Sequence, residues 1–308
     1  MVHGSLALSW NAADSPKCLQ ARQAGVTTVI EPRPKDIGNM YVRRALPSRE
    51  QRTLGPFVFW DQMGPAAFPP GVGMDVRPHP HIGLGTITYL FEGSIMHRDS
   101  LGTVQEIRPG DVNWMRAGRG IVHSERTPDH GRNGSALFGI QSWIALDAAE
   151  RESVPAFVHV PASELPALRG AGWSARVIAG SFRGLASPVP VTLPILYVDL
   201  TLEAGATFEL DPEHRERGIH IARGTLEVAA NAYSAGSMLV AAEGATLSLT
   251  TRTEARVLLL GGAPLQEKLH LWWNFVHTDL ARIEQAKADW KAQRFAKVPG
   301  DDEFIPLP

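Results

Sequence analysis

The sequence contains a single cysteine, Cys18, among its 308 residues. One thiol cannot form a disulfide within the chain or a cysteine-based zinc cluster, and so little cysteine is typical of a reducing compartment. The N-terminus has neither the basic start nor the long apolar core of a signal peptide, and no apolar run approaches the roughly 18 residues that span a bilayer. We therefore expect a cytoplasmic protein that is neither secreted nor inserted into a membrane.

Clusters of positive charge are also missing. The 30 basic and 32 acidic residues give a formal net charge of -2. No stretch concentrates Lys and Arg into a stripe that could follow a phosphate backbone, so direct binding to nucleic acid is not expected. Hydrophobic residues make up 44% of the chain, enough for a substantial core in about two domains.

Short runs that alternate apolar and polar residues dominate from Val26 onward. Runs such as FVFWDQ (57–62), GTITYLFEG (85–93) and SALFGIQSWIAL (135–146) are separated by Gly, Pro and Asp, the pattern of β-strands joined by turns. A stretch rich in Pro and Ala (161–172) interrupts the pattern, and a second β series follows. The simplest interpretation is an all-β chain with an unassigned segment at 1–24, a first barrel domain at 25–160, a linker at 161–172 and a second domain at 173–308.

The two series also share one phrase, seen as YLFEGSIMH (89–97) and as HIARGTLEV (220–228). In each, a strand ends in a turn that contains Gly, and another strand follows. Two occurrences about 130 residues apart suggest a duplicated barrel.

Near the end of the chain, the spacing of apolar residues changes from the alternation of strands to the period of a helix. Thr278 or Asp279 can cap a helix, and Pro299 forbids its continuation, so we expect a helix of about 15 residues that packs on one barrel. One helical stripe holds Leu280, Ile283, Ala286 and Trp290. The last residues, GDDEFIPLP (300–308), are acidic and rich in proline and are expected to lie along the surface as a tail.

Two pairs of polar residues stand at strand spacing. His79 and His81 project from one face of a strand, and Pro80 between them indicates an edge or the start of pairing. His123 and Glu125, about forty residues later, also share a face. Three imidazoles and one carboxylate from two short strands can meet around a divalent metal. A lone His-x-His pair is more often coincidence than ligand, but the second same-face pair favours a metal site.

The other histidines carry less information. His97 follows a hairpin turn and is interpreted as a surface residue or as a group just outside the ligand set. Glu92 is interpreted as a turn residue, and Glu106 as an outward strand residue. The remaining histidines stand singly and are interpreted as structural or exposed: His130, His159, His214, His220, His270 and His277. No P-loop, GxGxxG motif or Ser-His-Asp arrangement is present.

The histidine pairs lie in segments that resemble the two motifs of cupins, a superfamily of small β-barrels. The first motif reads G-x5-H-x-H-x3,4-E-x6-G, and it is fitted by Gly73, His79, His81 and Gly93. Its glutamate is missing, because Gly85 or Thr86 stands in its place. The second motif reads G-x5-P-x-G-x2-H-x3-N. Gly110 and Gly118 fit it, but Arg116 replaces the proline and His123 comes two residues late.

These departures resemble the pirin family, in which HPH-x-G is paired with AGRGI-x-H-x-E. The chain has HPHIG (79–83) and AGRGIVHSE (117–125), and GPFVFWDQMGP (55–65) and GGAPL (261–265) are also similar. The resemblance covers about residues 25–295. It implies two tandem cupin barrels with a short C-terminal helix, a metal in the first barrel held by His79, His81, His123 and Glu125, and a second barrel without metal, in which His220 has no partner two residues away.

The resemblance also implies an activity. Three neutral nitrogens and one carboxylate suit iron(II) best, while manganese, cobalt, nickel, copper and zinc also fit the donor types. Related cupins are quercetinases, which use such a metal and O2 to open the central ring of a flavonol and release carbon monoxide. Glu125 would be both a ligand and the general base that takes the proton of the 3-hydroxyl. Apolar walls could come from Phe59, Trp114 and Met115, although core packing is the simpler role for each.

Two other interpretations remain open. Pirins are also described as regulatory proteins, in which the oxidation state of the metal changes the surface offered to a protein partner. A cupin that only stores or binds a ligand is a third interpretation. The sequence does not determine the native metal, the physiological phenolic substrate or the oligomeric state.

Overall fold

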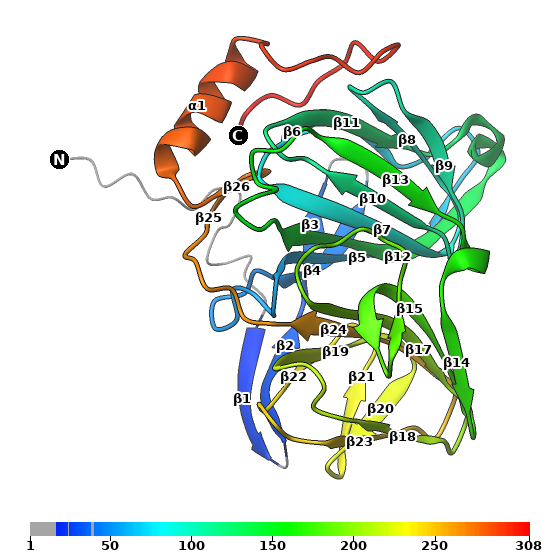
Figure 1. Ribbon diagram of the computed structural model, residues 1–308. Coiled ribbons are helices and arrows are strands. Elements are labelled where there is room, and N and C mark those ends of the chain that lie inside the picture. The colour runs from blue at the N-terminus through cyan, green and yellow to red at the C-terminus, as the bar shows by residue number, and fades with distance from the viewer. Residues whose placement is uncertain (1–16, 24, 38–39) are drawn as a thin grey trace.

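The computed structural model describes residues 17–23, 25–37 and 40–308. The strands of this part of the chain form two barrels, one stacked on the other (Figure 1), and the prediction of an all-β chain is confirmed. Short 3-10 helices occur at Asp129–Asn133 and Ala162–Glu164. No helix among the described residues is long and apolar enough to cross a membrane.

The first barrel is made of two sheets. The smaller sheet has the order β6 (Asp75–His81), β11 (Ile121–Arg126), β8 (Ile95–Asp99) and β9 (Val104–Ile107). The larger sheet has the order β13 (Ala156–Val160), β10 (Val112–Arg116), β7 (Leu84–Glu92), β12 (Ser135–Ala145), β5 (Phe57–Phe68), β4 (Tyr41–Leu46) and β3 (Arg33–Asp36). β6 is at the end of its sheet, which confirms the edge position that Pro80 predicts, since proline cannot donate to a ladder.

The second barrel repeats this plan. Its smaller sheet has the order β18 (Thr207–Leu210), β23 (Leu247–Thr250), β20 (Thr225–Val228) and β21 (Asn231–Ser234). Its larger sheet has the order β1 (Lys17–Gln23), β2 (Val26–Glu31), β22 (Met238–Ala241), β19 (Glu216–Arg223), β24 (Ala255–Gly262), β17 (Ile195–Leu202), β15 (Trp173–Phe182) and β14 (Ala167–Gly170), and β16 (Leu185–Ala186) also pairs with β15.

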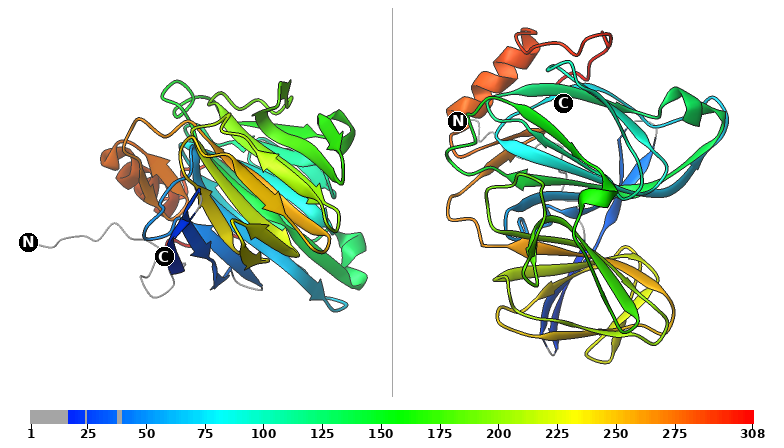
Figure 2. Two further views of the ribbon diagram at one scale, coloured as in Figure 1. Left: turned by 90° about the horizontal axis from the view of Figure 1, so that it is seen from below. Right: turned by 45° about the vertical axis from the view of Figure 1, so that its right-hand side comes forward.

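The observed strand pairing does not follow the predicted boundaries of the domains and the linker at two places. β2 lies inside the stretch assigned to the first barrel but pairs with β22 of the second barrel. The hairpin β1–β2 runs alongside this second barrel (Figure 2). The physical reason is burial on both faces, because Val29 packs in the core of the second barrel and Ile30 in the core between the barrels. The predicted linker contains β14, which pairs with β15.

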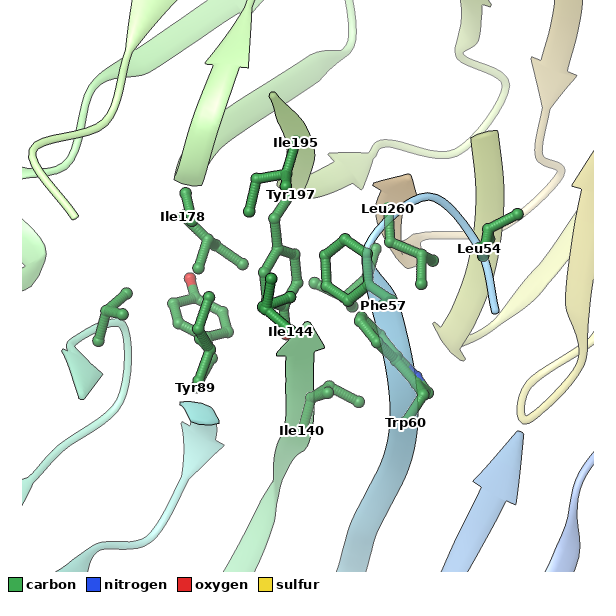
Figure 3. Close-up of a cluster of buried hydrophobic side chains, with 14 of the residues drawn as sticks. Leu54, Phe57, Trp60, Tyr89, Ile140, Ile144, Ile178, Ile195, Tyr197 and Leu260 are labelled. Carbon is green, nitrogen blue, oxygen red and sulfur yellow. The ribbon is translucent and has the colours of Figure 1, made fainter. Parts of the chain in front are cut away.

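The larger sheets of the two barrels pack against each other through an aromatic and aliphatic cluster (Figure 3). Phe57 and Trp60 of β5 meet Tyr197 of β17, with Phe57 and Tyr197 ring centroids 5.4 Å apart. A polar contact also joins the barrels, because the Tyr89 hydroxyl donates to the buried Asp199 at 2.7 Å. Arg256 pairs with Asp199 within the second barrel. This apolar interface fixes one barrel on the other.

The chain leaves the second barrel after β24 and returns to the first. β25 (His270–Trp272) and β26 (Phe275–His277) form a hairpin there, and α1 (Leu280–Lys291) follows. Phe275 bridges to Ile82 directly after β6. The buried Arg151 donates to Glu267 at 2.6 Å and to Thr278 at 3.1 Å. The C-terminal segment is thereby fastened to the barrel that carries the predicted site.

The helix is shorter than the predicted 15 residues. The Asp279 side chain accepts from the Ala281 N–H at 2.8 Å, as the N-cap prediction requires. The helix has 12 residues and ends well before Pro299, because Gln293 takes a left-handed φ of 53°. Ile283 and Ala286 are buried, but Leu280 at the start of the stripe is exposed. The tail lies on the first barrel as predicted, with the Ile305 N–H donating to the Pro78 carbonyl at 2.9 Å.

Candidate metal centre

Three neighbouring strands of the first barrel carry the polar side chains of the site. β11 lies between β6 and β8, so His123 is opposite His79 on one side and opposite Asp99 on the other. Glu125, two residues further along, is opposite His97. Residues two apart on a strand share a face, and all five side chains are buried. The sequence therefore concentrates imidazoles and carboxylates on the inner face of a small sheet.

A bulge in β6 shifts the register beside these residues. His123 is paired with His79, whereas Glu125 is paired with Val76, so β6 holds one more residue than β11 between the two pairs. Pro78 lies in this stretch, and bulges are among the few places in a sheet where proline fits. The extra residue separates Glu125 from His79 along the ladder.

The three predicted histidine ligands converge. The structure places one ligand atom from each of His79, His81 and His123 within 4.8 Å of the others, and the Nε2 atoms of His81 and His123 are 3.1 Å apart. The Nδ1 atom of His79 is 2.9 Å from the Arg77 carbonyl, and that of His81 is 3.2 Å from the Asn274 carbonyl. Carbonyl oxygens only accept, so both Nδ1 atoms carry the proton and both Nε2 atoms offer a lone pair. Such an outer carbonyl is typical for a histidine that binds metal through its other nitrogen.

Burial keeps these imidazoles neutral. Desolvation lowers the pKa of His79 to about 4, although the hydrogen bond to the Arg77 carbonyl acts in the opposite direction. The pKa values of His81 and His123 are held well below the usual range by burial and by the neighbouring imidazoles. Neutral imidazole is the form that binds a metal, so the three rings are available as ligands at neutral pH.

Glu125 lies in the same pocket but belongs to a second cluster of possible metal ligands. Its carboxylate belongs with His97 and His123 within 4.8 Å, not with His79 and His81. Thr88 Oγ1 is 3.3 Å from Glu125 Oε1 and 2.7 Å from Gln141 Oε1. Burial raises the pKa of Glu125, while His97 and the Thr88 hydrogen bond lower it by less. This carboxyl group therefore keeps its proton to a higher pH than an exposed glutamate does.

A cavity of about 330 Å³ opens beside the histidines. Its walls include the stacked rings of Phe59 and Trp143, whose centroids are 3.9 Å apart. Arg44 lies 4.3 Å above the Phe59 ring and binds Asp61 through two bonds of 2.8 Å. The C-terminal segment adds Trp273, Asn274 and Ile305 to the lining. The volume is within the usual range for a small-molecule pocket.

The structure separates the three apolar residues that the sequence proposed as walls. Phe59 lines the cavity. Trp114 packs in the core between the barrels, and Met115 packs with Ile121 and Phe157. Gly85 faces Trp114 so closely that a Cβ atom there would lie 2.0 Å from a ring carbon. A glutamate at Gly85 would collide with the Trp114 ring, which leaves Thr86 as the other position at which the motif's glutamate is missing.

The sequence left two interpretations of His97, a surface residue or a group just outside the ligand set, and the structure contradicts only the first. A surface position is wrong, since its side chain is 4% exposed, and the ring stacks on Phe157 with centroids 4.4 Å apart. Its Nδ1 atom is 3.4 Å from Nδ1 of His123, and Nε2 is 3.1 Å from Asp99. The spacing of His97 and Asp99 is the same His-x-acid pattern that marks His123 and Glu125, so the signal was present in the sequence.

The other single histidines lie outside the two groups. His220 points out of the second barrel toward the interface, where its Nε2 is 2.8 Å from the Gln62 amide oxygen. Burial lowers its pKa to about 3. His130 is exposed and binds Glu106, and His159 binds Asn113. Asn274 and Gln141 are contacts that the sequence did not reveal.

Comparisons with known proteins agree with this architecture. Residues 39–144 match the family Pirin, and residues 197–296 match the Pirin C-terminal cupin domain. A pirin-like protein of Caulobacter vibrioides is 48% identical over 92% of this chain and 99% of its own length. Pirin-1 of Arabidopsis thaliana is 32% identical over 81% of this chain and 86% of its own length. The crystal structure of a quercetin 2,3-dioxygenase from Acinetobacter baumannii has a TM-score of 0.85 and 36% identity, covering 91% of this chain and 94% of that one.

Two cupin barrels, with a cluster of buried histidines in the first that could hold a metal, define the chain as a bicupin. The matches along both barrels are specific to one branch of that class. The chain belongs to the pirin family, and the resemblance seen in HPHIG and AGRGIVHSE is confirmed.

Proposed function

We propose that this protein is a metal-dependent dioxygenase of the quercetin 2,3-dioxygenase type. The observation that carries the proposal is the convergence of His79, His81 and His123 beside a cavity with a buried carboxylate. The similarity to a quercetin 2,3-dioxygenase supports it. We keep the cytoplasm as the proposed location, because a single cysteine suits a reducing compartment.

The donor set fits a divalent ion. Nε2 atoms of His79, His81 and His123 would hold it, and Glu125 is the proposed fourth ligand. Iron(II) is the first choice for imidazole and carboxylate donors, and nickel, cobalt, copper, manganese and zinc are the alternatives. When bound, the ion supplies a Lewis acid that stabilises a negative oxygen of the substrate and the redox chemistry that O2 needs.

Glu125 is the proposed general base. It takes the proton of the flavonol 3-hydroxyl onto a carboxylate oxygen, which leaves a flavonolate in the pocket. Burial prepares it for this role, because its raised pKa makes it a stronger proton acceptor. The Thr88 hydroxyl lies between Glu125 Oε1 at 3.3 Å and Gln141 Oε1 at 2.7 Å and can donate its single proton to either acceptor. O2 then contributes both its atoms to the opened product while one ring carbon leaves as CO, so the flavonol is oxidised and O2 is reduced.

The cavity walls suit a planar phenol. Phe59 and Trp143 contribute apolar ring atoms to the lining, and His81 packs against the Trp143 ring with centroids 5.2 Å apart. The Arg44–Asp61 pair gives a polar end to an otherwise apolar lining. A polyphenol matches this mixture of flat apolar and hydrogen-bonding surface.

The test is anaerobic loading of the protein with each of iron, nickel, cobalt, copper and manganese, followed by quercetin and O2. We expect flavonol loss with release of one CO per turnover for at least one metal. Glu125→Gln should lower kcat by about 100-fold or more, because general bases contribute at least that factor. The half-buried His214 is not among the residues that line the cavity and provides a control, so His214→Ala should be fully active. No turnover with any of the five metals would exclude the enzyme and favour a regulatory protein that acts through a protein partner.

A further inference from the structure

The C-terminal segment forms part of the rim of the cavity. The floor of the cavity is buried and carries the histidines, Glu125 and Phe59, whereas solvent reaches other residues of the lining. Three of these partly accessible residues come from the C-terminal segment: Trp273, Asn274 and Ile305. The segment returns over β6 and β11 after α1 (Figure 1). The strands of the first barrel alone therefore do not complete the cavity.

Trp273 occupies a backbone position that is typical of glycine. It is the first of the two residues in the turn between β25 and β26, and its φ is 51°. This left-handed conformation is unfavourable for a residue with a Cβ atom, and Gly is the usual residue at such a turn position. Strained residues persist where the surrounding structure holds them, and they are frequent at functional sites. Here the strained position puts an indole ring in the cavity lining.

The turn that carries Trp273 is fastened to the strand of the proposed ligands. The Asn274 carbonyl oxygen is 3.2 Å from Nδ1 of His81. The Val276 N–H donates to the carbonyl of Ile82, directly after β6, at 3.1 Å. Trp273 is thus held beside the end of β6, where the first histidine pair lies.

Ile305 is held on both sides by its backbone. Its N–H donates to the Pro78 carbonyl of β6 at 2.9 Å, and its carbonyl accepts from the Trp290 indole N–H at 2.9 Å. Asp301, earlier in the tail, accepts two hydrogen bonds of 2.8 and 3.0 Å from Arg126 at the end of β11. Neither hydrogen bond of Ile305 involves its side chain, which is left to line the cavity.

We propose that Trp273 and Ile305 are specificity-determining residues, which form an apolar rim that selects a planar aromatic aglycone. The position of the substrate rests on the proposed function. When the hydroxyl that loses its proton lies at Glu125, the rest of a flat phenol extends toward the rim, because buried side chains close the floor. Apolar side chains at the rim favour an aromatic ring. They disfavour a sugar, since a sugar hydroxyl against them loses water without gaining a hydrogen bond.

The first test measures access to the histidines and needs neither metal nor turnover. Diethyl pyrocarbonate acylates imidazole nitrogens, and mass spectrometry gives the rate at His79 and His81 relative to the exposed His130. We expect this relative rate to rise several-fold in Trp273→Gly and in Ile305→Ala, because each change opens the rim. Unchanged rates in both variants would overturn the proposal.

Both substitutions are chosen to keep the fold. Gly favours the φ that Trp273 adopts, and Ile305→Ala retains both backbone hydrogen bonds of the tail. Phe304→Ala is the matched control, because Phe304 is the exposed neighbour of Ile305 and is not among the residues that line the cavity. Its relative rate should equal that of the unmodified protein. A rise as large as in Ile305→Ala would show that any change in the tail opens the cavity, and would overturn the role of the Ile305 side chain.

The second test compares substrates. With the metal that gives turnover, Trp273→Gly and Ile305→Ala should each raise KM for quercetin by about 10-fold. The value of kcat should stay nearly constant, because contacts at the rim bind the ground state and the transition state alike. The preference in kcat/KM for quercetin over its glucosides substituted away from the 3-hydroxyl should shrink.

The outcomes of the two tests separate this proposal from the proposed function. An unchanged KM together with an unchanged preference in both variants would overturn the specificity role. If no metal supports turnover, the proposed function fails, and the access test still decides whether Trp273 and Ile305 control entry to the cavity.

Discussion

The buried carboxylate of Glu125 should lower the stability of the metal-free protein and raise the stability of the metal-bound protein. Glu125 is 8% exposed, and the hydrogen bond from Thr88 that it accepts is long, at 3.3 Å. Burial raises its pKa in the folded state. The protonated folded form is therefore favoured, so stability is fully present below the usual carboxyl pKa and is lost as pH rises through the raised one. Above that pH, the metal-free protein carries an uncompensated charge.

Replacement of Glu125 by Gln should therefore stabilise the metal-free protein at pH 8. Glutamine has nearly the same shape and can keep the contact with Thr88. The gain is about 1.4 kcal/mol for each unit by which the folded-state pKa exceeds the unfolded one, and each kcal/mol raises Tm by about 2–4 °C in a domain of 150–250 residues. The difference between the two proteins should vanish at pH 4, where Glu125 is protonated.

Metal should act in the opposite direction, and it should invert the order wherever the variant's gain without metal is below about 2 kcal/mol. A ligand at 100 times its Kd stabilises the folded state by about 2.7 kcal/mol, whereas one at its Kd contributes only about 0.4 kcal/mol. If loss of the Glu125 charge weakens metal binding 100-fold, the unmodified protein gains about 2 kcal/mol more than the variant at the same metal concentration. The assay is thermal unfolding of both proteins at pH 4 and pH 8, with and without Zn²⁺. A metal-free variant less stable than the unmodified protein at pH 8 would refute the reasoning.

Three further predictions concern the neighbouring residues. The pKa of His79 is lowered from its usual value of 6.5 to about 4. The free energy of unfolding of metal-free protein should therefore fall by about 3 kcal/mol as the pH decreases from 6.5 through about 4. A free energy of unfolding that stays constant over this pH range would contradict the lowered pKa of His79. Gly85→Ala would bring a Cβ to 2.0 Å from the buried Trp114 ring. The change should lower the free energy of unfolding by about 1–3 kcal/mol, and the metal content of the folded protein should not change. A melting temperature equal to that of the unmodified protein would show that the Trp114 ring can move aside at no cost. Arg44→Met leaves the buried Asp61 without its partner and should cost about 3–5 kcal/mol, whereas the double change with Asp61→Leu should recover most of it; equal losses in both variants would show that the charge of Asp61 is not the cause.

The local sequence pattern was sufficient to predict which side chains share a face on the strands that carry the proposed ligands. The spacing of His79 with His81 and of His123 with Glu125 put each pair on one face, and Pro80 indicated the edge. Strand alternation is a local property, so it can be read from a single segment. The same rule applied to His97 and Asp99 would have indicated a third inward pair, but a turn just before them favoured a surface interpretation.

Contacts between distant segments could not be read in this way. Asn274, whose carbonyl meets His81, is 193 residues further along the chain, and no local pattern connects them. The pairing of β2 with β22 joins the start of the chain to the second barrel, although the alternation of β2 alone fits either barrel. The bulge in β6 between His79 and Val76 changes which residue faces Glu125. Each of these depends on packing of the complete fold.

We propose that His79, His81 and His123 bind one divalent metal in the first barrel. Elemental analysis of protein purified without chelator or added metal, followed by titration of stripped protein with Zn²⁺, tests it most directly. We predict one ion per chain, a stoichiometry near zero when His81 and His123 are both replaced by Ala, and no change in His214→Ala. Absence of bound metal in the unmodified protein under both conditions, or full stoichiometry in the double variant, would show that these histidines do not form a metal site.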